Sequence, residues 1–233
     1  MNKKYLLPRL GLILLLTSCG ETKEEPGLFH RWPERSQALV DSLSNTFDAG
    51  LDANLYAIRG NQNGSTNENL VVVAKDMNVY YKKIGNFYKD EDSPWDAKHK
   101  EGIELDVKPI LTSTVKLYYR GMLITNEGAV HKLPAASIER KFSVDSYKLQ
   151  SVFDGNINKD HAYPQIDKDE RFLEGAVSGF VPGFTEMLQQ MTPGDRVEVY
   201  IPYKYGYGKN GSGSIPGYST LVFDLTLVDI TKF

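Results

Sequence analysis

A glycine-rich segment near the C-terminus is the first place where the spacing of residues could indicate chemistry. Residues 206–211 read Gly-Tyr-Gly-Lys-Asn-Gly and satisfy the spacing G-x-G-x-x-G. In dinucleotide-binding proteins a helix follows this spacing, and the N-terminus of that helix faces the pyrophosphate. Here Gly213 and Pro216 follow, and then a strand-like run. The segment therefore does not predict a nucleotide site, and we expect no cofactor.

Two other groups of side chains could in principle hold a metal ion. Residues 154–160 begin like a calcium-binding loop, but Lys159 and Gln165 stand where such a loop needs glycine and glutamate. The four histidines show no ligand spacing, and no cysteine can join them in the folded domain. A histidine paired with a serine and an acid is not supported either, because the chain has no G-x-S-x-G turn. We therefore expect no metal site.

The only cysteine, Cys19, follows a short apolar run. The chain begins with the basic stretch Met1-Asn2-Lys3-Lys4, and Leu10 to Leu16 is apolar apart from Gly11. This run is too short to span a bilayer and is typical of a secretory signal. Leu16-Thr17-Ser18-Cys19 resembles the bacterial lipobox, which implies cleavage before Cys19 and acylation of its sulfur and of the new N-terminus. Two or more acyl chains make a stable membrane anchor.

The anchor predicts the location of the protein. We expect residues 1–18 to be a lipoprotein signal peptide and residues 19–32 to be a polar tether. Gly20, where an aspartate would retain a lipoprotein in the inner membrane, resembles the sorting signal for the outer membrane. The protein is therefore expected at the outer membrane, on the periplasmic side or the cell surface.

Composition limits the other classes of partner. The net charge is −3 and no basic block is present, so nucleic-acid binding has little electrostatic support. Charged residues make up 24% and hydrophobic residues 41% of the chain, as in a folded soluble domain. If Cys19 is lipidated, no thiol remains to form a disulfide, so stability must come from a packed core. A chain of 233 residues is long enough to form one.

An ordered series of motifs near the C-terminus indicates a family. Residues 179–191 read GFVPGFTEMLQQM, and residues 192–230 read TPGDRVEVYIPYKYGYGKNGSGSIPGYSTLVFDLTLVDI. Together they resemble the FKBP-type peptidyl-prolyl cis–trans isomerases. VYYKKIG (79–85) and VKLYYRGML (115–123) resemble upstream strands of the same family, and VFDG (152–155) resembles its Phe-Asp element. The resemblance covers residues 77–233, with extra segments near 86–108 and 125–148.

The resemblance implies a pocket that binds proline-containing polypeptides. Asp154 and Tyr207 match catalytic side chains, and the backbone N–H of Val181 would hold a substrate carbonyl. The expected wall of the pocket is apolar and aromatic: Tyr119, Phe153, Phe172, Phe180, Phe184, Ile215 and Phe223. The family pattern makes Asp154 a buried aspartate. Phe184 stands where the family usually has tryptophan, and Gly217 stands where it has a second proline.

The expected chemistry is rotation about the X–Pro amide bond. Resonance opposes this rotation by about 18–20 kcal/mol, so the uncatalysed step takes tens to hundreds of seconds. The twisted amide has lost its resonance and carries less charge separation than either planar form. A dehydrated apolar pocket therefore favours it over both ground states, without any transfer of a proton.

The elements that must position these residues follow from periodicity. An apolar stripe at helical spacing predicts a helix from about residue 32 to residue 47, and Pro33 suits its first turn. A second, short helix is expected over residues 182–191. Strand-like runs cover residues 70–74, 79–84, 112–124, 196–202 and 220–231. The predicted fold is α+β: an FKBP-like antiparallel sheet wrapped around a short helix, with an N-terminal helical extension over residues 33–76.

Two hypotheses for the function remain open. The first is a prolyl isomerase that assists folding of extracytoplasmic proteins. The second is an FKBP-like binding or chaperone module with little turnover. The expected partners are proline-containing polypeptides, the membrane through the lipid anchor, and macrolides of the kind that this family binds. The N-terminal helix is expected to dock on the outside of the domain or to pair with another copy, as it would in a purely structural lipoprotein subunit.

Overall fold

The computed structural model describes residues 29, 31–60, 76–123, 151–158, 161–166 and 171–232. The predicted signal peptide with Cys19, the strand-like run at 70–74 and the insertion at 125–148 lie outside the described residues. Within these ranges, no helix is both long enough and apolar enough to cross a membrane.

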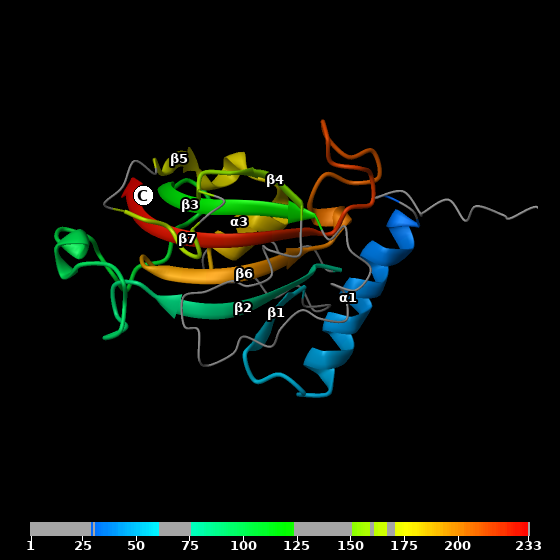
Figure 1. Ribbon diagram of the computed structural model, residues 1–233, viewed down its shortest axis with the longest axis horizontal. Coiled ribbons are helices and arrows are strands. Elements are labelled where there is room, and N and C mark those ends of the chain that lie inside the picture. The colour runs from blue at the N-terminus through cyan, green and yellow to red at the C-terminus, as the bar shows by residue number, and fades with distance from the viewer. Residues whose placement is uncertain are drawn as a thin grey trace, which may run out of the picture.

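In the described part of the chain, seven strands form one antiparallel sheet (Figure 1). Their order across the sheet is β1-β2-β6-β7-β3-β4, and β5 also pairs with β3, next to β4. The strands are β1 (Leu55–Arg59), β2 (Asn78–Asn86), β3 (Thr114–Leu123), β4 (Ser151–Gly155), β5 (Leu173–Ala176), β6 (Asp195–Ile201) and β7 (Leu221–Lys232). The long strands match the predicted runs, whereas β1, β4 and β5 were not among those runs.

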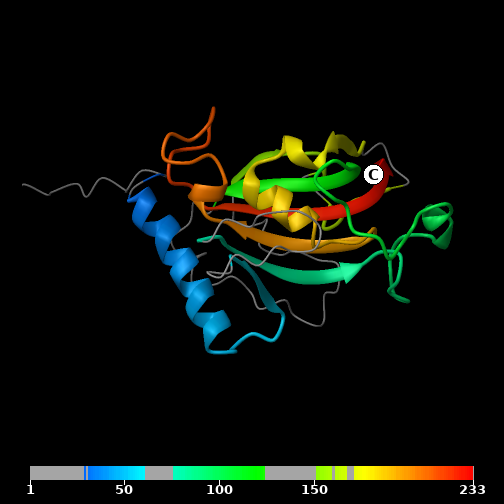
Figure 2. The same ribbon diagram turned by 180° about the vertical axis from the view of Figure 1, so that it is seen from behind.

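Alternation along the strands divides their side chains between two buried faces. In β3, Val115 and Leu117 belong to the main core, whereas Tyr118 and Met122 face the opposite side. Successive strand residues point to opposite faces, so each face receives every second side chain. The short helix α3 (Pro182–Leu188) covers the inner face, as the two opposite views show (Figures 1 and 2). The α+β architecture is therefore as predicted.

The outer face is covered by two separate segments. Helix α1 (Trp32–Asp48) packs Leu39 and Leu43 against Tyr80 and Tyr200 of the sheet. Pro33 lies in the first turn of α1, as expected, and most of the apolar stripe is thereby buried within the chain. Near the other end of the strands, part of segment 86–108 forms a third cluster. This cluster is built from Phe87, Tyr88, Trp95, Tyr118, Ile157 and Val228.

The charged residues of the C-terminal motifs form a buried ion pair on this outer face. Arg196 Nε and Nη2 donate to the two carboxylate oxygens of Asp224 at 2.8 and 2.7 Å, and both side chains are fully buried. Arg196 Nη2 also donates to the carbonyl of Ala162 at 2.8 Å. A buried charge is tolerated only when it is paired and hydrogen-bonded in this way. The pair joins β6 to β7, and neither residue lines the pocket described below.

Short helical turns complete the described elements. They are the 3-10 helices η1 (Ala97–Lys100), η4 (Val177–Gly179) and η5 (Tyr203–Tyr205). The turn η4 leads directly into α3, and η5 opens the loop between β6 and β7. These two turns carry the chain around the site described next.

Candidate functional site

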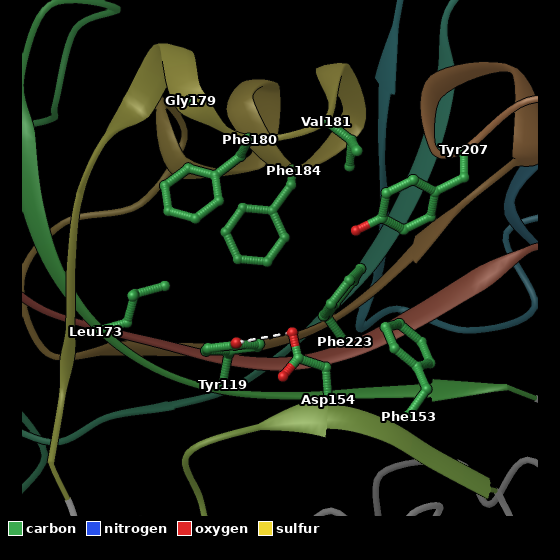
Figure 3. Close-up of a pocket in the computed structure, with 10 residues that line it drawn as sticks. All are labelled: Tyr119, Phe153, Asp154, Leu173, Gly179, Phe180, Val181, Phe184, Tyr207 and Phe223. Atoms are coloured by element: carbon green, nitrogen blue, oxygen red, sulfur yellow. Dashed lines mark hydrogen bonds between the residues drawn. The ribbon is translucent and has the colours of Figure 1, made fainter. Parts of the chain in front are cut away.

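A pocket of about 230 Å³ opens between the start of α3 and the inner face of the sheet (Figure 3). Its lining is Tyr119, Phe153, Asp154, Leu173, Gly179, Phe180, Val181, Phe184, Tyr207 and Phe223. These residues come from β3, β4, β5, β7, the segment from η4 into α3, and the β6–β7 loop. The fold thus collects most of the residues that the motifs singled out into one cavity.

Aromatic rings in contact form the floor of the pocket. Phe184 stacks on Phe180 with ring centroids 4.8 Å apart and meets Phe223 edge to face at 5.0 Å. Phe153 meets the other side of Phe223 at 5.8 Å. A Cβ on Gly121 would lie 2.6 Å from the Phe153 ring, so the glycine of the YYRGML motif leaves room for this ring. The floor is therefore apolar and tightly packed, which suits an uncharged ligand group.

Tyr119 and Asp154 form the polar pair of the pocket. The Tyr119 hydroxyl donates to Asp154 Oδ2 at 2.9 Å, as the dashed line in Figure 3 marks. Burial, together with this carboxylate, raises the pKa of Tyr119 to about 12. The other carboxylate oxygen, Oδ1, accepts the backbone N–H of Gly155 at 2.8 Å. Asp154 therefore orients a tyrosine hydroxyl that stays protonated at neutral pH.

The expectation of a buried Asp154 is wrong, because the residue is exposed. The reason is its position in β4, which among the described strands lies at the edge of the sheet and pairs with β3 alone. Asn156 fixes the end of this strand: its side chain accepts from the backbone N–H of Tyr119 at 2.8 Å and donates to the Leu117 carbonyl at 3.0 Å. Asn156, which belongs to the segment that resembles a calcium loop, thus uses its side chain to bond backbone groups of β3.

The backbone N–H of Val181 is the predicted donor to a substrate carbonyl. Val181 is the residue that precedes α3, and its carbonyl accepts from the N–H groups of Phe184 and Thr185. Among the hydrogen bonds of the described residues, none uses the Val181 N–H itself. Thr185 Oγ1 donates to the Val177 carbonyl at 2.8 Å and holds the preceding turn against the helix. Thr185 was not among the predicted site residues, although its side chain holds the turn that carries the predicted donor.

Tyr207 enters the pocket from the loop between β6 and β7. Its ring approaches from the side opposite Leu173, and its hydroxyl points into the cavity (Figure 3). The residue is 37% exposed, so it forms the rim and not the floor. A hydroxyl at the rim can reach the backbone of an extended ligand that crosses the opening.

Phe172 was predicted to line the pocket and lies outside it. It is 44% exposed and lies under the Lys116 ammonium, which is 5.2 Å from the ring centroid. In β5, Leu173 pairs with Leu117 and faces the pocket instead. Because a shift of one residue moves a side chain to the other face of a sheet, the wrong register gave the wrong residue.

Ile215 also lies outside the pocket, because its side chain is buried in the main core behind the wall. A tight turn, in which Ser212 and Ile215 exchange backbone hydrogen bonds, directs it there. Gly179 lines the pocket and was not predicted, because a glycine has no side chain that would indicate a role in binding. Among the described residues, no group of three or more histidine, cysteine, aspartate or glutamate side chains could hold a metal ion.

The sequence is similar to those of a known family. The model of the family "FKBP-type peptidyl-prolyl cis-trans isomerase" matches residues 106–228. FkpA of Buchnera aphidicola is 31% identical over 90 residues, which are 39% of this chain and 36% of that protein. FkpA of Escherichia coli K12 is 43% identical over 58 residues, or 25% of this chain and 22% of that protein. The chain therefore matches well under two thirds of the length of these relatives.

Solved structures were compared as well. The crystal structure of FkpA from Escherichia coli covers 87% of this chain and 62% of its own, with 19% identity and a TM-score of 0.48. A peptidyl-prolyl cis-trans isomerase from Pseudomonas syringae covers 84% of this chain and 96% of its own, with 16% identity and a TM-score of 0.44.

Proposed function

Because the chain belongs to the FKBP-type peptidyl-prolyl cis-trans isomerase family, we propose that it catalyses rotation about X–Pro bonds in other polypeptides. The observation that carries this proposal is the pocket: an aromatic floor with the Val181 amide and the Tyr207 hydroxyl at its edge. An isomerase needs an apolar cavity for the proline ring and donors that hold the flanking carbonyls.

The mechanism follows from the loss of resonance in the twisted amide. The proline ring enters the cavity over Phe184 and Phe223, where water is excluded. The Val181 N–H and the Tyr207 hydroxyl hold substrate carbonyls, so that one side of the amide is fixed while the other turns. The twisted amide is less polar than either planar form, so the apolar floor lowers its free energy more than theirs.

Asp154 acts in this mechanism through electrostatics and orientation. Its carboxylate accepts a hydrogen bond from the Tyr119 hydroxyl. This bond fixes the Tyr119 ring edge to face against Phe184 of the floor. No bond to hydrogen breaks during rotation, so no general base is required. Macrolides of the kind that the family binds are proposed to occupy the same cavity.

A protease-coupled assay with a proline peptide tests the activity. The chain without residues 1–25 should accelerate cis-to-trans conversion, and Tyr207→Phe should lower kcat/KM by about 2–10-fold, the worth of one neutral hydrogen bond. Tyr203→Phe is the matched control, because Tyr203 lies in the same loop but does not line the pocket. Its ring meets that of Tyr218 in a tilted arrangement, with centroids 5.0 Å apart. Equal rates with and without the protein would refute the activity.

The alternative is a binding or chaperone module with little turnover. Phe184 in place of the usual tryptophan favours it, because the floor loses area and an indole N–H. In that case proline peptides would bind the pocket, and Tyr207→Phe would weaken the binding, while the rate of isomerisation would stay at the uncatalysed value. Measuring affinity and rate on one preparation separates the two functions.

We also propose that the protein is a lipoprotein of the outer membrane that assists folding outside the cytoplasm. The basic start, the short apolar run and Leu16-Thr17-Ser18-Cys19 support the anchor. Cys19→Ser should leave an unprocessed chain without acyl groups, as mass spectrometry of the N-terminal peptide would show. An unmodified Cys19 in the membrane-associated protein would contradict the anchor.

A further inference from the structure

The N-terminal end of α1 is bonded to the loop that carries Tyr207. Trp32 Nε1 donates to Ser219 Oγ at 2.8 Å in a buried contact. One turn further along α1, the Ser36 carbonyl accepts from Thr220 Oγ1 at 3.0 Å. Figures 1 and 2 both show this end of α1 beside the orange loop between β6 and β7. Segments far apart in the sequence are therefore joined by buried hydrogen bonds at one end of the sheet.

Further hydrogen bonds within the β6–β7 loop (residues 202–220) connect Ser219 to Gly208, the residue that follows Tyr207. Ser219 Oγ, which accepts from Trp32, donates to the Pro216 carbonyl at 2.6 Å. The backbone N–H of Tyr218 donates to the Gly208 carbonyl at 3.0 Å. Gly217 lies so close to Lys209 that a Cβ would overlap the Lys209 carbonyl oxygen. The glycine that replaces the usual proline thus allows the two arms of the loop to touch.

This loop has little secondary structure of its own to hold Tyr207. It contains one 3-10 turn, Tyr203–Tyr205, and an isolated bridge between Ser212 and Ile215. Within the loop, the backbone N–H groups of Gly206 and Gly208 donate to the Tyr203 carbonyl and close the turn around Tyr207. These bonds are local, so the position of that turn relative to the pocket depends on contacts with other parts of the chain. Trp32 is 4% exposed and belongs to the same core cluster as Tyr205 and Ile215, so it is a rigid anchor.

We propose that Trp32, with Ser36, is a positioning residue for the substrate-holding Tyr207. Helix α1 fixes the 216–220 arm, that arm fixes Gly208 and Lys209, and Tyr207 is thereby kept in its place at the rim of the pocket. The inference rests on the proposed function only where Tyr207 is taken to hold substrate. When the competent arrangement is populated for only a fraction of the time, apparent affinity falls by that fraction. Loss of the Trp32 bond should therefore raise KM more than it lowers kcat.

The chain offers a matched control, because it has two tryptophans. Trp95 is also buried, and its Nε1 donates to the Pro164 carbonyl at 2.9 Å in the third cluster, which contains no residue of the 202–220 loop. Trp32→Phe and Trp95→Phe each keep an aromatic ring and remove one buried indole N–H. We expect the two variants to lose similar stability, because each removes one buried hydrogen bond. Only the bond of Trp32 involves the 202–220 loop.

The test compares hydrogen exchange of the loop amides in the full chain, purified in mild detergent. Trp32→Phe should speed exchange of the Tyr218 amide and its neighbours about 10-fold, leave the α3 amides unchanged, and weaken binding of a proline peptide about 3–10-fold. Trp95→Phe should change neither quantity. Ser219→Ala is the second variant: it removes the bond from Trp32 and also the bond to the Pro216 carbonyl. Its effect combined with Trp32→Phe should be less than additive, since both variants remove the Trp32–Ser219 bond.

Each outcome decides the proposal. Loop exchange that is equal in Trp32→Phe and Trp95→Phe would overturn it. Faster exchange with unchanged peptide affinity would show that α1 anchors the loop and would refute a role in positioning Tyr207. If the parent binds peptide without speeding isomerisation, the proposed activity fails, whereas loop exchange and peptide affinity still test the role of Trp32.

Discussion

At the scale of a residue, the hydrogen bond between Tyr119 and Asp154 makes the contribution of one carboxylate to catalysis testable. Asp154→Ala removes the acceptor of the Tyr119 hydroxyl and the negative charge at the rim. A hydrogen bond to a charged group is worth about 1.5–3 kcal/mol, so we expect kcat/KM for a proline peptide to fall about 10–100-fold. Thermal unfolding should stay cooperative, because the exposed carboxylate contributes little to the core.

The matched control for Asp154→Ala is Asp106→Ala. Asp106 is exposed and pairs with Lys89 on the surface, away from the pocket. Its removal should leave the rate unchanged. If both variants isomerise the peptide as fast as the parent, Asp154 has no role in the reaction.

Glu186 gives the protein a stability that depends on pH. The residue is 6% exposed in α3, and burial raises the pKa of its carboxyl. An unfolded glutamate has a pKa of about 4.3. Since the folded pKa is higher, the stabilising contribution of the protonated form is fully present below about pH 4.3 and is lost as pH rises through the folded value.

Glu186→Gln removes this loss, because glutamine carries no charge at any pH. We expect its Tm to exceed that of the parent by about 1–3 °C at pH 7.5, and the difference to vanish near pH 4. Glu91→Gln, at an exposed position, should show no such trend. Calorimetry at several pH values measures both, and a difference that does not depend on pH would contradict the explanation.

At the scale of elements, the two-sided sheet explains why α1 is needed. The outer face of the strands carries Tyr80, Met122, Tyr200 and Val222, and α1 covers them. Without α1 these apolar side chains would face water, at a cost of about 25 cal/mol for each Å² of exposed apolar surface. Helix α1 is therefore part of the packing and not a spacer alone.

The contribution of α1 can be measured at one position. Leu39 is 2% exposed, so Leu39→Ala should lower the free energy of unfolding by about 2–5 kcal/mol. Leu51 is 77% exposed just beyond the helix, so Leu51→Ala should change it by less than about 0.5 kcal/mol. Urea unfolding of both variants makes the comparison. Equal, small changes would mean that α1 does not stay docked in solution.

At the scale of the whole molecule, we propose that the isomerase domain spans residues 77–233 and that residues 33–76 are an extension docked on it. A chain that starts at residue 69 loses α1 and β1 but keeps the other strands and α3. It should still fold and isomerise, with a KM that is raised because Trp32 and Ser36 no longer hold the β6–β7 loop, and with a Tm lower by about 10 °C or more because the outer face is uncovered. A circular dichroism spectrum of an unfolded chain would contradict the boundary.

The oligomeric state belongs to the same scale. Leu39 and Leu43 are buried against the sheet of their own chain. Pairing of α1 with a second copy would have to use the opposite, polar face of the helix. Light scattering on the longer chain should therefore give the mass of a monomer.

The sequence by itself determined the family, the order of the main elements and most of the pocket. Ordered motifs identify Tyr119, Phe180, Val181 and Phe184 because each motif fixes its own local geometry. Alternation within β3, β6 and β7 and helical spacing in α1 are likewise local, since each depends on residues a few positions apart. The aromatic floor could be predicted for that reason.

Only the tertiary structure decided the features that depend on pairing between distant segments. Whether Phe172 or Leu173 faces the pocket depends on the register of β5 against β3, and no local signal sets it. The exposure of Asp154 follows from the edge position of β4. The bond from Trp32 to Ser219 arises because packing of α1 on the sheet brings its first turn to the β6–β7 loop. Such contacts result from the sum of many weak long-range interactions, and no single motif encodes them.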